Sequence, residues 1–158
     1  MASQLGKTSQ SRGKADVAAL VLATCELTPR RTCRLPPTLL SPGAARSFVE
    51  AELCPEHGRA AVSAVQLVAS EMVTHAVVHG SREIELALVC RVGEIVVTVT
   101  DDQVLDAAPV DATDRLRLAL VAKIGRATGV EPTPDGEVWW CTVPTGVAPV
   151  PRQIPRPD

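Results

Sequence analysis

One short stretch of the chain carries side chains that can bind a metal: Glu71, His75 and His79 are spaced four residues apart. On a helix this spacing places all three on one face. Two histidines four residues apart can chelate zinc or another transition metal. No second group of ligands accompanies them nearby in the sequence. His75 and His79 are therefore candidate metal ligands, but the pattern by itself does not predict a metal site.

Three more charged residues lie at the ends of predicted elements. Asp101 ends a predicted strand and is followed by Asp102, an arrangement for which a turn or capping role is ordinary. Arg115 and Arg117 lie at the start of a predicted helix, where cations interact unfavourably with the helix dipole. They are a phosphate clamp, a patch for an anionic partner, or simply exposed basic residues.

Composition describes one aliphatic domain. The chain has 158 residues, 46% of them hydrophobic, and its only aromatic residues are one Phe and two Trp. The net charge of −2 and the lack of an aromatic platform argue against direct nucleic-acid binding. No apolar run approaches the length of a transmembrane helix, so we expect no membrane contact.

The cysteines predict reduced thiols rather than a framework of cross-links. Their number is odd, and no pair has Cys-x-x-Cys spacing, which disfavours both a disulfide scaffold and a zinc ribbon. Mostly buried thiols in a cytoplasmic protein are expected. The five cysteines are Cys25, Cys33, Cys54, Cys90 and Cys141.

Local patterns divide the chain into a folded domain at 31–143 between two tails. We expect 1–30 to be largely disordered, with a short helix or an edge strand at 15–27. The tail 144–158 has five prolines and is expected to be extended or disordered.

Hydrophobic periodicity predicts three helices and five strands inside this domain. Ser41 and Asp114 are the expected N-caps of the first and third helices. Trp139 and Trp140 should face opposite sides of a strand. The predicted helices are 41–53, 59–79 and 114–127, and the predicted strands are 31–35, 83–90, 95–100, 130–133 and 137–143.

This element order predicts an α/β (α+β) two-layer sandwich. We expect a mostly antiparallel mixed sheet of about five strands, with three helices on one face. In both central strands, alternate apolar residues should face the helices.

Residues 70–80 read SEMVTHAVVHG. They resemble the helix motif Ser-Glu-Leu-Val-Thr-Asn-Ala-x-x-His-Gly of the GHKL (histidine-kinase-like) ATPase superfamily, in its branch of anti-sigma regulatory factors or serine-protein kinases. Shorter matches lie at 34–37, 99–102, 118–121 and 133–139, so the resemblance covers more than two thirds of the chain.

The resemblance implies a role for each matching position. Glu71 would be the general base that polarises a seryl hydroxyl or a water. Asp101 would accept a hydrogen bond from the adenine amino group of ATP. The loop before Leu118, here with Arg115 and Arg117, would cover the phosphates, which Mg²⁺ would bridge.

The chain departs from the family pattern at the nucleotide site. The family's magnesium-binding Asn is His75, and imidazole suits Mg²⁺ poorly. The Gly-x-Gly of the phosphate loop is replaced by residues 115–117, Arg-Leu-Arg. Glycines let backbone amides approach phosphates, and arginines do not supply that geometry.

Two functions follow from the resemblance. One is a cytoplasmic regulatory protein of the anti-sigma type that binds a sigma factor or an antagonist protein, with weakened or lost ATP binding. The alternative is an ATP- and Mg²⁺-dependent serine-protein kinase that phosphorylates an anti-anti-sigma partner. The resemblance also implies a homodimer. A third hypothesis, from His75 and His79, is a metal-responsive regulator.

Overall fold

The computed structural model describes residues 30–54, 57–103 and 111–146. The expectations for the tail 1–30, including the segment 15–27, fall almost entirely outside the described residues. The expectations for residues 147–158 of the C-terminal tail also fall outside the described residues.

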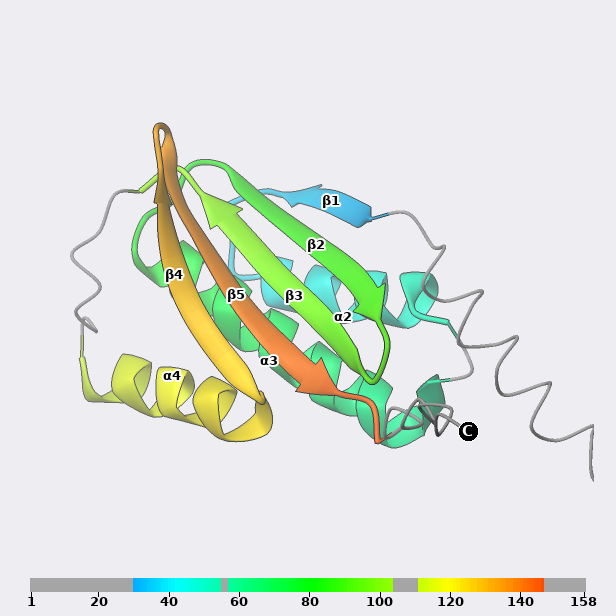
Figure 1. Cartoon of the computed structure of the whole chain (residues 1–158). Helices are drawn as coiled ribbons and strands as arrows, with labels where there is room; N and C mark the ends of the chain where they lie inside the picture. The colour runs from blue at the N-terminus through cyan, green and yellow to red at the C-terminus, as the bar shows by residue number, and fades with distance from the viewer. Residues whose placement is uncertain (1–29, 55–56, 104–110, 147–158) are drawn as a thin grey trace, which may run out of the picture.

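Five strands form one sheet in the order β1-β2-β3-β5-β4 (Figure 1). Every pairing in it is antiparallel, so the sheet is not mixed. The strands are β1 Arg31–Leu35, β2 Ile84–Arg91, β3 Glu94–Asp101, β4 Ala127–Thr133 and β5 Gly136–Pro144. The five strands predicted from the sequence are therefore confirmed, although β4 begins earlier than expected.

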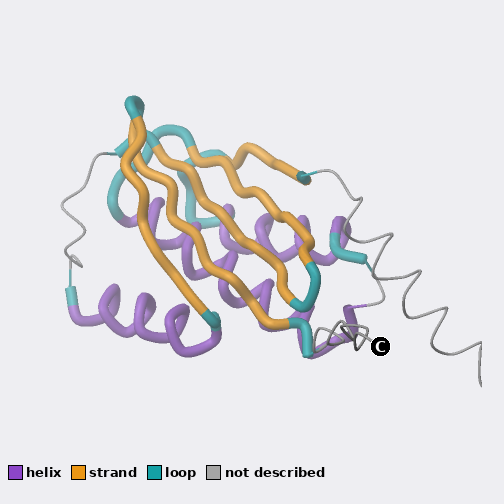
Figure 2. The backbone as a smooth tube through the Cα atoms, in the orientation of Figure 1, coloured by secondary structure: helices purple, strands orange, loops and turns teal. Residues whose placement is uncertain are grey.

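Three helices cover one face of this sheet, as Figure 2 shows. They are α2 Ser41–Glu52, α3 Gly58–Val78 and α4 Ala112–Ile124. The long helix α3 lies between the other two and packs against β3 and β5. The predicted two-layer α+β sandwich is confirmed.

Alternation along the central hairpin decides which side chains form the core. Ile84, Leu86 and Leu88 of β2 are at most 2% exposed. Their partners across the ladder, Asp101, Val99 and Val97, point to the same face. The core is aliphatic, as the composition predicted.

Two predicted N-caps are wrong, by one residue for α2 and by three residues for α4. Leu40, not Ser41, is the N-cap of α2, and the Ser41 hydroxyl instead donates to the carbonyl of Pro36. Asp111 caps α4, where its carboxylate accepts a hydrogen bond from the backbone N–H of Asp114 at 2.8 Å. The side chain of Asp114 is thereby available for a contact elsewhere.

Helix α3 is long and apolar enough, by length and composition, to cross a membrane. This differs from the expectation that no run of the chain approaches that length. Half of its most apolar window is buried inside this domain, because α3 is the middle helix of the layer that packs against the sheet.

The β4–β5 turn packs closely on the end of β3. A Cβ at Gly136, whose φ is +156°, would lie 1.9 Å from the carbonyl oxygen of Asp101. We predict that Gly136→Ala lowers the free energy of unfolding by about 2–4 kcal/mol, because the backbone there must shift. Urea denaturation measures this change. The matched control is Gly43→Ala, where a helical residue has room; equal losses for both variants would contradict the packing argument.

Candidate functional site

The carboxylate of Asp114 lies at the centre of a buried polar network between α3 and α4. Its Oδ1 is 2.7 Å from Nδ1 of His75, and its Oδ2 is 3.0 Å from Nε2 of His79. Asp114 is fully buried and His75 is 3% exposed. Sequence reasoning placed Asp114 only at a helix start, so this contact was missed.

Arg117 connects the same network to Glu71. Its guanidinium lies 3.0 Å from Oε2 of Glu71 and 3.0 Å from Oδ1 of Asp114. Arg117 and Asp114 are three residues apart on α4, a spacing that places them on one helical face. Four predicted site residues, Glu71, His75, His79 and Arg117, are therefore brought together by a carboxylate that was not among them.

The hydrogen bonds of His75 determine where its proton lies. A carboxylate can only accept, so Nδ1 carries the hydrogen that bonds to Asp114. Burial lowers the pKa of His75, while the hydrogen bond to Asp114 acts in the opposite direction. Nε2 is left as an acceptor with no hydrogen-bond partner among the described residues. The ring contacts Trp139, with centroids 4.5 Å apart.

Asp101 is buried at the end of β3, 3% exposed. Its Oδ1 accepts the backbone N–H of Gln103 at 2.9 Å, whereas Oδ2 has no hydrogen-bond partner within the described part of the chain. Burial, helped by the nearby charges of Glu137 and Asp102, raises the pKa of Asp101 to about 6. The backbone hydrogen bond from Gln103 and the charge interaction with His79 act against that rise, so Asp101 borders the network.

Asp102 has the turn role that the Asp-Asp pair suggested. Its carboxylate accepts the backbone N–H of Arg82 at 2.7 Å and forms an ion pair with the side chain of Arg82. These contacts lower the pKa of Asp102. The two neighbouring aspartates therefore differ: Asp102 is stabilised as a carboxylate and Asp101 is not.

Arg115 lies outside the network. It is exposed and makes no salt bridge with any described residue. Beside it, Leu116 is 72% exposed and Leu120 is 37% exposed. Val121, and not these two leucines, is the residue of α4 that is buried in the hydrophobic core.

A small pocket of about 200 Å³ lies next to the network, between α3, α4 and strands β4 and β5. His75, Met72 and Trp139 are among its lining residues. Sites for drug-sized ligands usually measure about 300–1,000 Å³. In this arrangement the pocket is too small for a nucleoside triphosphate.

A second, more open pocket of about 390 Å³ lies at the ends of β1, β2 and β3 and beside the β4–β5 turn. Charged residues of both signs line it, among them Arg34, Arg82 and Glu85. Asp101 is one of its lining residues, whereas His75 and His79 are not.

The residues of the network do not fit Mg²⁺ and the phosphates of ATP. Imidazole is a poor ligand for Mg²⁺. The guanidinium of Arg117 is paired with two carboxylates, so it is not directed at a phosphate. A transition metal fits better, because ligand atoms of His75, His79 and Asp114 lie within 4.8 Å of one another. The charge of Arg117 on Asp114 would oppose it.

Asp101 generates a prediction about pH. Its folded-state pKa of about 6 exceeds the ordinary aspartate pKa of 3.8. The contribution of Asp101 to stability is therefore greatest below about pH 4 and declines as the pH rises to about 6. We expect Asp101→Asn to raise the free energy of unfolding at pH 7.5 by about 1–3 kcal/mol, with no gain at pH 4. Urea denaturation at both pH values measures this.

The control for this prediction is Asp102→Asn, which removes a carboxylate that is stabilised by Arg82. It should give no gain at pH 7.5. A stabilisation by Asp101→Asn that is equal at both pH values would show that the charge is not its cause.

The network predicts unequal effects for the two arginines of α4. Arg117→Met removes the guanidinium that pairs with the buried Asp114 and with the partly exposed Glu71. We expect this change to lower the free energy of unfolding by about 2–4 kcal/mol. Arg115→Met should change it by less than about 0.5 kcal/mol. Thermal or urea unfolding distinguishes the two, and similar values for both would contradict the role of Arg117.

Comparisons with known proteins give a distant likeness. No protein-family model matches the sequence, and no curated protein matches it. Among solved structures, the chain is similar to the histidine kinase domain from Erythrobacter litoralis EL346 blue-light activated histidine kinase, at 19% identity and a TM-score of 0.45. The match covers 66% of this chain and 59% of that chain. A likeness at this level does not inform on activity, ligand or partner.

Proposed function

We propose that the chain is a regulatory protein of the anti-sigma-factor type, which binds a sigma factor or an antagonist protein and has weak or no ATP binding. The observation that carries this proposal is the pairing of Arg117 with both Glu71 and Asp114, each at 3.0 Å. The sequence resemblance to the anti-sigma branch supplies the kind of partner.

The pairing removes the features on which phosphate transfer would depend. Glu71, the general base implied by the resemblance, is held by a guanidinium at 3.0 Å. The ion pair occupies the carboxylate that a general base would have to turn toward the reacting hydroxyl. His75, at the position of the magnesium ligand, is bonded to Asp114. Binding of a partner requires neither residue to react.

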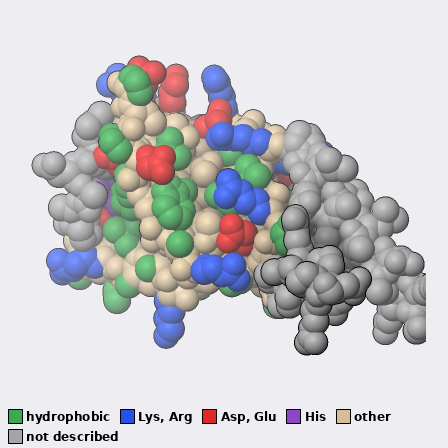
Figure 3. Space-filling model, in the orientation of Figure 1, with side chains coloured by type: hydrophobic (Ala, Val, Ile, Leu, Met, Phe, Trp, Pro, Cys, Tyr) green, Lys and Arg blue, Asp and Glu red, His purple; other side chains and the backbone are tan. Residues whose placement is uncertain are grey.

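Exposed apolar side chains support a protein partner. Leu116 and Leu120 are four residues apart on the outer face of α4, next to the exposed Arg115. On the face of the sheet that the helices do not cover, hydrophobic side chains gather over β4 and β5 (Figure 3). Trp140 belongs to this face and lies against Gly129. Aromatic and large aliphatic residues at a surface are typical of interfaces.

One observation favours the alternative, an ATP-dependent serine-protein kinase. Oδ2 of the buried Asp101 has no hydrogen-bond partner among the described residues. An adenine amino group is the kind of donor that would satisfy it. In either case we expect a cytoplasmic protein that does not bind nucleic acid or membrane directly, and that forms homodimers as the resemblance implies.

Calorimetric titration of the full chain with ATP, with and without Mg²⁺, tests the choice. We expect no binding at millimolar ATP under either condition. Micromolar binding that needs Mg²⁺ and is weakened at least tenfold by Asp101→Asn would contradict the proposal and support the kinase.

A second measurement uses Glu71→Ala. Binding to the sigma factors or antagonist proteins of the same cell should be unchanged in this variant, because Glu71 has no reactive role in the proposal. Transfer of phosphate from ATP to a partner serine, lost on this substitution, would establish the kinase instead.

A further inference from the structure

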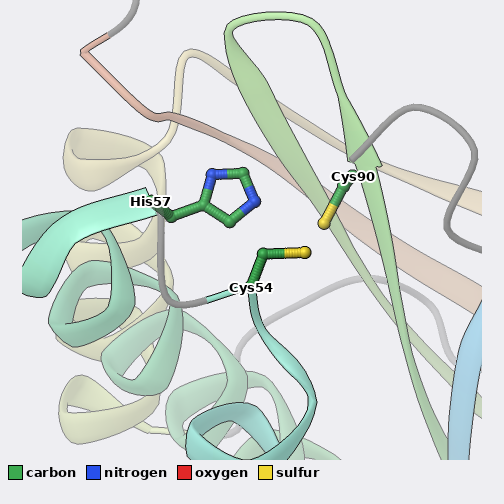
Figure 4. Close-up of side chains that lie close together, drawn as sticks. All are labelled: Cys54, His57 and Cys90. Atoms are coloured by element: carbon green, nitrogen blue, oxygen red, sulfur yellow. The ribbon is translucent and has the colours of Figure 1, made fainter. Parts of the chain in front are cut away.

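Two cysteines and a histidine lie together at the corner between α2 and α3. Ligand atoms of Cys54, His57 and Cys90 are all within 4.8 Å of one another. Figure 4 shows the two sulfurs and the imidazole directed toward a common space. The two thiols are not joined in a disulfide.

The fold brings these three residues from separate places. Leu53, buried in the core, ends α2, and Cys54 follows it. The backbone N–H of His57 donates to the carbonyl of Cys54 at 3.2 Å, which keeps these two residues close together. His57 is also the N-cap of α3.

The third residue comes from the sheet. Cys90 is the next-to-last residue of β2 and follows Leu86 and Leu88 at steps of two. Its side chain therefore lies on the face that the helices cover. The end of β2 thus lies beside Cys54 and His57, and two sulfurs and one imidazole come together there.

This set of donors has a defined chemical preference. Thiolate sulfur and imidazole nitrogen are ligands for zinc, whereas Mg²⁺ and Ca²⁺ take oxygen. Around a tetrahedral zinc ion, bond lengths of about 2.3 Å to sulfur and about 2.0 Å to nitrogen put these ligand atoms about 3.5–3.8 Å apart. The present separations of the three atoms, all within 4.8 Å, are near that range.

We propose that Cys54, His57 and Cys90 bind one Zn²⁺ ion, whose fourth position is taken by water. The metal links the residues between α2 and α3 to the end of β2. This site is independent of the proposed function, since His57 and His79 lie at opposite ends of α3. It is also separate from the cluster of His75, His79 and Asp114.

Titration of the reduced, metal-free full chain tests the site. Zn²⁺ is added in competition with a colorimetric chelator, and Co²⁺ is used in parallel because thiolate ligation gives a charge-transfer band. We expect one equivalent of Zn²⁺, a thiolate–cobalt band and a rise in melting temperature with Zn²⁺. Cys54→Ser and Cys90→Ser should each lose all three.

Two controls distinguish this site from other sources of binding. Cys33→Ser removes a half-buried thiol of the neighbouring strand that is not in the cluster, and it should bind as the wild type does. His79→Ala should also keep the thiolate–cobalt band. Loss of binding in His79→Ala with retention in Cys54→Ser would place the metal in the other cluster and overturn the proposal.

A measurement on the wild type covers variants that fail to fold. Zn²⁺ should protect Cys54 and Cys90 from alkylation and leave the rate for Cys33 unchanged, as followed by mass spectrometry of peptides. Equal protection of all three thiols, no protection, or no Zn²⁺ bound by the reduced wild type would each overturn the proposal.

Discussion

The buried carboxylate of Asp114 is the constraint on which the candidate site depends. A fully buried carboxylate is strongly destabilising unless donors surround it. Here two imidazoles of α3 and a guanidinium of α4 do so, at 2.7–3.0 Å. These contacts define the position of α4 along α3. They also occupy the space beside Glu71, so one electrostatic requirement determines both how the helices pack and what the site can bind.

The two buried aspartates near this site differ in the hydrogen bonds that their carboxylates accept. Asp114 has a donor for each oxygen, whereas Oδ2 of Asp101 has none among the described residues, and burial raises the pKa of Asp101 to about 6. An arrangement that lowers stability in a folded domain often marks a site of function. Asp101 is therefore the residue on which the choice between partner binding alone and nucleotide binding depends.

Helix α3 has different chemistry at its two ends. Its last turns carry His75 and His79, which bond to Asp114; its N-cap, His57, lies beside Cys54 and Cys90. Between the ends the helix is core, with residues such as Val65 and Val68 fully buried. Because the ends are about 30 Å apart, at about 1.5 Å per residue, a metal at one end and the ion-pair network at the other do not share ligands.

The sequence by itself determined the elements and the layer that each strand faces, because periods of two and of 3.6 depend only on local backbone geometry. Ile84, Leu86 and Leu88 lie in the core as their alternation predicts. Only the tertiary structure decided the histidine partners of Asp114, which are 35 and 39 residues away, and the exposure of Leu116. Cys54 and His57 form a Cys-x-x-His pattern that is visible in the sequence but was missed there. Cys90 lies beside them only because β2 ends near the residues between α2 and α3. Contacts between side chains so far apart in sequence depend on how the helices pack on the sheet.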